Sequence, residues 1–70
     1  MNEEAFSTSI RKFLKMVGVS SQRDIEQAVQ RALADGRIRG DETLAATMKL
    51  SIAGIGLDVE FDGRIALEAS

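Results

Sequence analysis

The sequence predicts an α+β fold in which two N-terminal helices pack on one face of a three-stranded antiparallel β-meander, in the order α-α-β-β-β. Two observations support this fold. Apolar residues recur at helical spacing up to residue 34, and from residue 43 onward they alternate with polar residues, which is typical of half-buried strands. Because 70 residues are enough for only one small domain, we expect a single domain over residues 1–70.

The first helix is expected over residues 3–17. Asn2 is a suitable N-cap, and Glu3 and Glu4 follow in the first turn, where the helix dipole favours negative charge. Gly18 is expected to end the helix as its C′ residue. One face of this helix collects large apolar side chains, namely Phe6, Ile10, Phe13, Leu14 and Val17.

A second helix is expected over residues 22–34, after a short connection at residues 18–21 that makes the two helices a corner or a hairpin. Ser21 and Asp24 resemble a capping box at its start, and Asp35-Gly36 marks its end. Its apolar stripe has smaller residues than that of the first helix, namely Ile25, Ala28, Val29, Ala32 and Leu33.

Three strands are expected, over residues 43–52, 55–61 and 64–68. A two-residue turn at Ala53-Gly54 aligns the apolar residues of the first two strands and sets Lys49 opposite Asp58. A three-residue turn over residues 61–63 keeps the apolar residues of the third strand on the same face. One alternative stays open, a two-stranded ribbon whose long second strand runs through Gly63.

The residue types exclude several kinds of chemistry. The chain has no cysteine and no histidine, which removes disulfides, common zinc sites, thiol nucleophiles and imidazole bases. We therefore predict no catalytic residue, no cofactor and a protein that is not an enzyme. The segment from Asp58 to Gly63 resembles the first half of a calcium-binding EF-hand loop. Since Ala69 stands where the bidentate glutamate belongs, no metal is expected there.

Location and stability follow from the same composition. No apolar run approaches the roughly 20 residues of a membrane span, and the acidic start at residues 2–4 does not resemble a secretory signal. We expect a cytoplasmic protein without membrane contact. A core this small supplies only about 3–5 kcal/mol, so such scaffolds usually depend on disulfides, metals or self-association. With the first two excluded, self-association is the means that remains.

Binding is the predicted function, and two classes stay open. The first is a protein-interaction or self-associating module, acting as a homodimer or with an unknown protein partner, because open sheet edges accept further strands. The alternative is a weak nucleic-acid binder that uses the basic helical half. Residues 1–40 carry seven basic and five acidic side chains, against two and six in residues 41–70. The net charge of −2, and Asp24 at an apolar position of a helix-turn-helix, disfavour nucleic acid.

Basic side chains define a candidate surface for an acidic partner. An equally good interpretation is that they are solvated surface charges that contribute only to solubility. The candidates are Arg11, Lys12, Lys15, Arg23, Arg37 and Arg39.

Several stretches carry a resemblance to a known family, namely Ser9–Lys15 with Val17–Glu26, Gly40–Leu44, and Gly54–Leu57 with Gly63–Glu68. Over nearly its whole length the chain resembles a family of small bacterial proteins of similar size that is catalogued as a domain of unknown function. The resemblance implies a complete protein of bacterial origin, and it brings no activity, ligand or functional residue. Exposed polar residues in the Gln22–Asp24 turn and the Gly40–Leu44 loop are where we expect function to lie.

Overall fold

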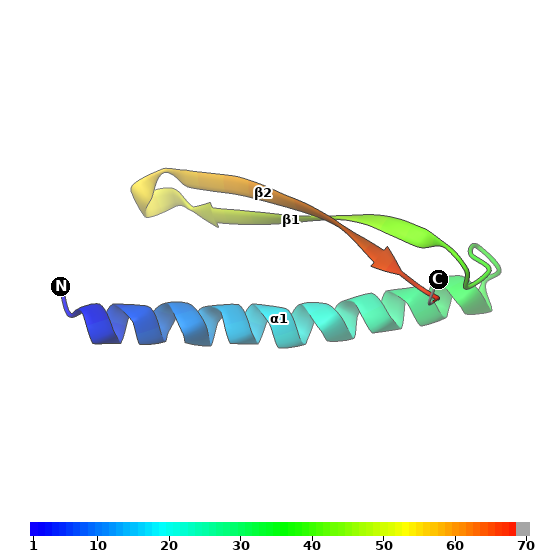
Figure 1. The fold of residues 1–70 in the computed structure, drawn as a ribbon, viewed down its shortest axis with the longest axis horizontal. Helices are drawn as coiled ribbons and strands as arrows, with labels where there is room; N and C mark the ends of the chain where they lie inside the picture. Colours follow the sequence, from blue (N-terminus) through cyan, green and yellow to red (C-terminus); the bar gives the residue numbers. More distant parts are fainter. Residues whose placement is uncertain (69–70) are drawn as a thin grey trace. The chain divides into compact units, whose positions relative to one another are not determined.

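The structure is a computed structural model that describes residues 1–68. It contains one long helix, α1 (Glu3–Ala34), then strand β1 (Thr43–Ile52), a short 3-10 helix η1 (Ala53–Ile55) and strand β2 (Leu57–Ala66) (Figure 1). The chain divides into two units, Met1–Arg37 and Ile38–Ser70. The first unit holds the helix and the second holds the β-hairpin, and each is described by itself.

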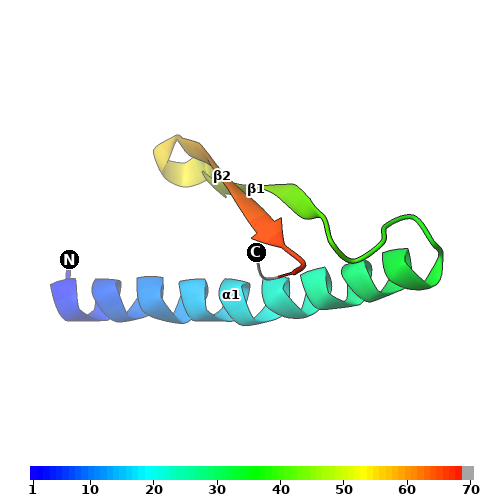
Figure 2. The same cartoon turned by 45° about the vertical axis from the view of Figure 1, so that its right-hand side comes forward.

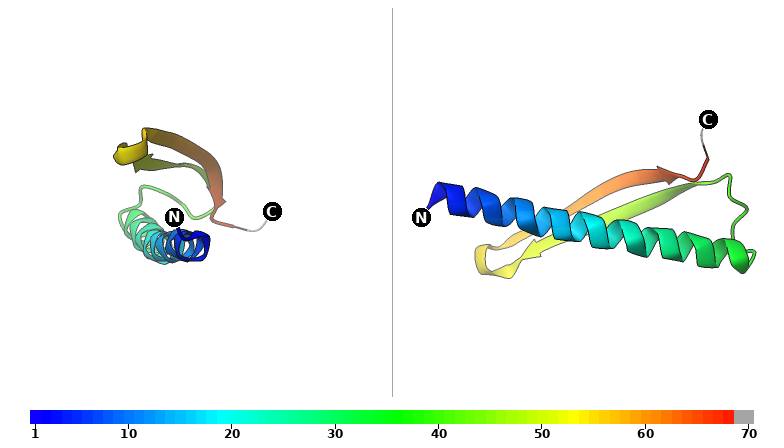
Figure 3. Two further views of the ribbon diagram at one scale, coloured as in Figure 1. Left: turned by 90° about the vertical axis from the view of Figure 1, so that its left-hand side faces the viewer. Right: turned by 90° about the horizontal axis from the view of Figure 1, so that it is seen from below.

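The prediction of two helices is wrong, because α1 continues without a break through residues 18–21 (Figure 3). A glycine ends a helix when it takes the left-handed conformation of a C′ residue. Gly18 does not do so, since the glycines with positive φ in the described chain are Gly36, Gly40 and Gly56. A glycine followed by Val19 and two serines lowers helix propensity without forcing a stop, so the sequence signal was ambiguous at this point.

Both ends of α1 have well-formed caps, as the sequence predicted. The side-chain oxygen of Asn2 accepts a hydrogen bond of 3.0 Å from the backbone N–H of Ala5. At the other end, Gly36 has a φ of 73°. Its N–H donates to the carbonyl of Leu33, and the N–H of Arg37 donates to the carbonyl of Ala32, at 3.2 and 2.9 Å. This pair of bonds is the Schellman arrangement that closes a helix at a left-handed glycine.

The three-stranded meander is also wrong, because β1 and β2 form a two-stranded antiparallel sheet. β1 occupies the residues predicted for the first strand, and β2 runs straight through Gly63, as in the alternative of one long second strand. The turn at the tip takes four residues, Ala53 to Gly56, and includes η1 (Figure 2). Ile52 therefore pairs with Leu57, and the predicted two-residue turn at Ala53-Gly54 and three-residue turn at 61–63 do not form.

The register explains why both turns were misplaced. Ile52 was expected to pair with Ile55, and it pairs two residues further along. A shift of two residues leaves every side chain on the same face of a strand, so the apolar alternation cannot distinguish the two registers. Lys49 lies opposite Glu60 and not opposite the expected Asp58. Gly63 lies opposite Ala46, and the apolar face continues past this small pair without a second turn.

None of the described residues is buried, so these residues form no buried core. The most protected side chains of α1 include Val17 and Val29, and those of the hairpin include Leu50 and Val59, and all of these are only half-buried. Taken by itself, each unit thus carries an apolar face that it does not cover with its own residues.

Candidate interaction surfaces

The first candidate surface is the apolar face of α1. At 3.6 residues per turn, its large N-terminal side chains fall on one side of the helix. We call this set the α1 stripe, and it is made of Phe6, Ile10, Phe13, Leu14 and Val17. Phe6 and Leu14 are 52% and 54% exposed, which is unusual for residues of this size in a folded domain. Taken by itself, the first unit has no other element that covers the stripe.

The second candidate surface is one face of the hairpin. Because even-numbered residues of β1 pair with odd-numbered residues of β2, all the large apolar side chains of both strands lie on the same side. We call this the hairpin apolar face, made of Leu44, Ala46, Met48, Leu50 and Ile52 with Leu57, Val59, Phe61, Gly63 and Ile65. Met48 and Phe61, which pair with each other, are 44% and 56% exposed.

The other hairpin face is polar and internally matched. The hydroxyl of Thr47 donates to Asp62 at 3.1 Å, and the Nζ of Lys49 lies 3.5 Å from a carboxylate oxygen of Glu60. Asp58 accepts a bond of 3.4 Å from the hydroxyl of Ser51. The acidic residues that resembled an EF-hand loop thus stand in a row on a straight strand, each facing a partner on β1.

Within the described residues, no group of three or more acidic side chains could hold a metal ion. Ala69, the residue at the twelfth position of the calcium pattern, lies outside the described residues.

The third candidate surface is the backbone along the two free edges of the hairpin. The N–H of Leu67 donates to the carbonyl of Glu42 at 3.0 Å, just beyond the ends of the two strands. The register is uniform from this pair to the turn. The even-numbered residues from Glu42 to Ile52 therefore direct their backbone N–H and C=O groups toward β2. The groups that point away from the hairpin belong to Thr43, Ala45, Thr47, Lys49 and Ser51 on β1, and to Asp58, Glu60, Asp62, Arg64 and Ala66 on β2.

The predicted basic surface is distributed over both units. Four of its six residues lie along α1, on the side away from the α1 stripe, namely Arg11, Lys12, Lys15 and Arg23. Arg37 follows the helix and forms an ion pair with Asp35 at 3.2 Å. Arg39 belongs to the second unit, where its Nε lies 3.5 Å from Asp41.

The two segments where function was expected have different structures. Gln22–Asp24 is not a turn, because it lies within α1. Gly40–Leu44 does contain a loop, and the carboxylate of Glu42 organises it. This carboxylate accepts hydrogen bonds of 2.9 Å from the backbone N–H groups of both Arg39 and Gly40. These bonds lower the pKa of Glu42 below its ordinary value of 4.5.

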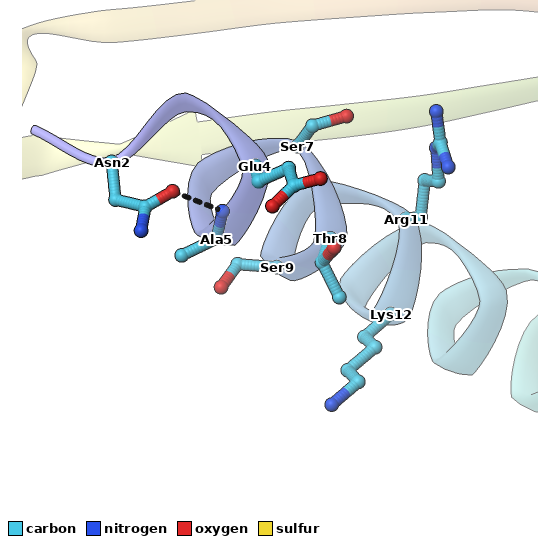
Figure 4. A pocket seen from close by; sticks show the side chains of 8 residues that line it. All are labelled: Asn2, Glu4, Ala5, Ser7, Thr8, Ser9, Arg11 and Lys12. Carbon is cyan, nitrogen blue, oxygen red and sulfur yellow. Dashed lines mark hydrogen bonds between the residues drawn. The ribbon is translucent and has the colours of Figure 1, made fainter.

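A shallow hollow on the first turns of α1 is shown in Figure 4. Every residue that lines it comes from the first unit between Asn2 and Lys12, and the side chains of Arg11 and Lys12 extend outward from the helix. A hollow formed by one helix lacks the opposing walls that a small-molecule site needs. We therefore assign no ligand to it.

Comparison with known proteins identifies the family. The sequence model of a family of unknown function, DUF6494, matches residues 1–68 of the chain. The chain belongs to DUF6494. No curated protein and no solved structure matches this DUF6494 chain. In the part of the chain that the structure describes, no helix is long and apolar enough to cross a membrane.

The sequence predicts open strand edges but does not identify which residues lie on them. The signal was present in the alternate residues of the two strand segments, which are mostly neutral in β1 and mostly charged in β2. This difference in charge can be interpreted only once the register is known, because the register shows which backbone groups point away from the hairpin.

Proposed function

We propose that this protein functions as a self-associating interaction module whose apolar surfaces are completed by a second copy of the chain. One observation supports this proposal above the others. None of the described residues is buried, although both units carry an apolar face that is suited to burial. A chain without cysteine or histidine has neither disulfides nor common zinc sites with which to compensate for a missing core.

Neither unit is expected to be stable in isolation. A two-stranded hairpin is at best marginally stable in water. A lone helix depends mainly on tertiary packing of its apolar face, and Gly18 costs α1 about 1 kcal/mol relative to alanine. Each unit therefore needs another surface to pack against.

The free energy available from association is large enough. Apart from Met1 at the start of the chain and Ile55 in the hairpin turn, eleven large apolar side chains of α1, β1 and β2 are between 38% and 56% exposed. Covering the exposed half of one such side chain contributes about 1 kcal/mol. Covering half of the set therefore contributes about 5 kcal/mol per copy, which is comparable with the stability of an ordinary small domain.

Sedimentation equilibrium over a hundredfold range of protein concentration, combined with thermal unfolding across the same range, tests the proposal. We expect the mass of two chains at the higher concentrations and a Tm that rises with concentration, because association stabilises only the folded state. The mass of one chain together with a cooperative transition that is independent of concentration would refute self-association. A single chain that unfolds without cooperativity would also refute it, and would indicate a different protein as the partner.

The alternative function, weak nucleic-acid binding, has one observation in its favour, the four basic residues along one side of α1. The continuous helix removes the helix-turn-helix version of this hypothesis. Fluorescence anisotropy with labelled duplex and single-stranded DNA at low salt tests the remaining version. Unchanged anisotropy at high protein concentration would exclude it.

A further inference from the structure

We propose that β1 pairs edge to edge with β1 of a second copy, antiparallel and centred on Thr47, to give a four-stranded sheet in the order β2-β1-β1-β2. The inference rests on the proposed self-association and names the strand edge and register at which the two hairpins join. It joins the two hairpin apolar faces, and covering them is a separate part of the association. It follows from the direction of the backbone groups, the charges on the two edges and the parity of the register.

The backbone leaves two free edges, and charge distinguishes them. Along β1 the outward-facing residues are small or neutral apart from Lys49. Along β2 four of the five are charged, namely Asp58, Glu60, Asp62 and Arg64. Charged side chains disfavour the addition of a further strand, and like charges placed opposite each other in a sheet are destabilising. The β1 edge is therefore the one that can accept a partner.

The occupant of the β1 edge is a second copy because the edge is complementary to itself. A two-fold axis through Thr47 sets Thr43 opposite Ser51 and Ala45 opposite Lys49, with Thr47 opposite its own counterpart. No like charges meet in this arrangement, and threonine pairs are favourable across strands. On the other side of the new sheet, Leu44 faces Leu50, so the hairpin apolar faces of the two copies become one continuous face.

The register follows from hydrogen bonding. The apolar faces join only when residues of the same parity lie opposite each other. Centring on Thr47 uses the outward backbone groups of all five edge residues of each β1. Centring on Met48 leaves those of Thr43 without a strand partner. The pairing centred on Thr47 is therefore the one that satisfies the whole edge.

Symmetry also favours this arrangement over its alternatives. Pairing of β1 with itself is isologous and closes after two copies. Pairing of β1 with β2 of another copy is heterologous and leaves a free edge at each end, so it would produce assemblies of no fixed size. A sheet of four strands with one apolar face also exceeds the two-stranded limit below which sheets are marginal.

Proline substitutions on the two edges provide a matched test. The N–H of Thr47 points away from β2, so Thr47→Pro removes no backbone hydrogen bond within the hairpin but removes one from the proposed interface. Within the hairpin it removes only the exposed side-chain bond to Asp62. Glu60→Pro makes the equivalent change on the β2 edge. Sedimentation equilibrium should show at least a tenfold weaker dimer for Thr47→Pro and an unchanged dimer for Glu60→Pro. Equal dimerisation of both variants would overturn the β1 interface while leaving self-association in place, and wild-type protein that stays monomeric would overturn both.

Single cysteines give an independent readout that does not require a destabilising substitution, because the natural chain has no cysteine. Residues opposite each other in a hydrogen-bonded antiparallel pair have Cα atoms about 5.5 Å apart, within the range of a disulfide. Mild oxidation should link Thr47→Cys into a covalent dimer, whereas Thr43→Cys and Ser51→Cys should link only when mixed with each other. Equally efficient linking of Thr43→Cys alone, or of Glu60→Cys, would contradict the proposed register.

Discussion

Replacing Gly18 by alanine should stabilise the protein, whereas the same replacement at Gly36 should destabilise it. Gly18 lies inside α1 with no positive φ, and a methyl group added there meets no atom within 4 Å. Alanine restricts the unfolded chain and fits the helix, so we expect a gain of about 0.5–1 kcal/mol. For a domain of this size that raises the Tm by about 2–8 °C.

Gly36 also has open space around the added methyl group, but its φ is 73°. The left-handed conformation costs a residue with a side chain roughly 1–2 kcal/mol. We therefore expect Gly36→Ala to lower the Tm by about 4–16 °C. The two variants add the same atoms in equally open surroundings, so the difference in sign isolates backbone conformation as the cause.

The measurement is urea and thermal unfolding followed by far-UV circular dichroism, with all three proteins at one fixed concentration because association contributes to stability. A loss of stability for Gly18→Ala would refute the reasoning at that site. It would show that another element approaches Gly18 in solution and fills the space that is open in the structure. Unchanged stability of Gly36→Ala would refute the assignment of the helix cap.

Three further predictions concern single side chains. Asn2→Ala should cost about 1 kcal/mol and increase amide hydrogen exchange in the first turn of α1, and unchanged exchange would contradict the cap. The pKa of Glu42 is lowered by the backbone N–H of Arg39 and a neighbouring amide, so its contribution to stability is complete above pH 4.5 and is lost as the pH falls through the lower pKa of the folded state. An NMR titration should show the Arg39 amide moving in that acidic range in wild type and not in Glu42→Gln. Lys49→Ala should cost less than about 0.5 kcal/mol, because its ion pair with Glu60 is exposed, and a loss above 2 kcal/mol would assign Lys49 a different role.

The parts of the fold that could be predicted from the sequence are those fixed by local chemistry. Asn2 followed by two glutamates specified the start of α1, and Asp35-Gly36 specified its end. The change from helical to alternating periodicity located β1 at its observed bounds. Each of these signals depends on neighbouring residues, and local signals of this kind are what a single sequence states most clearly.

The parts that could not be predicted are those where the local sequence is compatible with two different structures. Gly18 is compatible with a helix interior and with a helix end, and continuation through residues 18–21 decided between them. The hairpin has two registers, two residues apart, that place the same side chains on the same faces, so periodicity could not choose between turns. The β1 edge required the same information, since the parity of outward backbone groups follows from hydrogen bonding and not from residue type.

The acidic row on β2 has a consequence for the behaviour of the chain at high concentration. Natural sheets resist amyloid growth by placing charged gatekeepers on exposed edges, and Asp58, Glu60 and Asp62 occupy that position. The chain contains no proline that would serve the same purpose. Neutralising the three carboxylates together would leave one charged residue on each edge of the hairpin, Arg64 on β2 and Lys49 on β1, so the β2 edge would become about as available to incoming strands as the β1 edge. The ten residues of β2 therefore complete the hairpin with one edge and, through the acidic side chains on the other edge, disfavour the addition of further strands into a fibre.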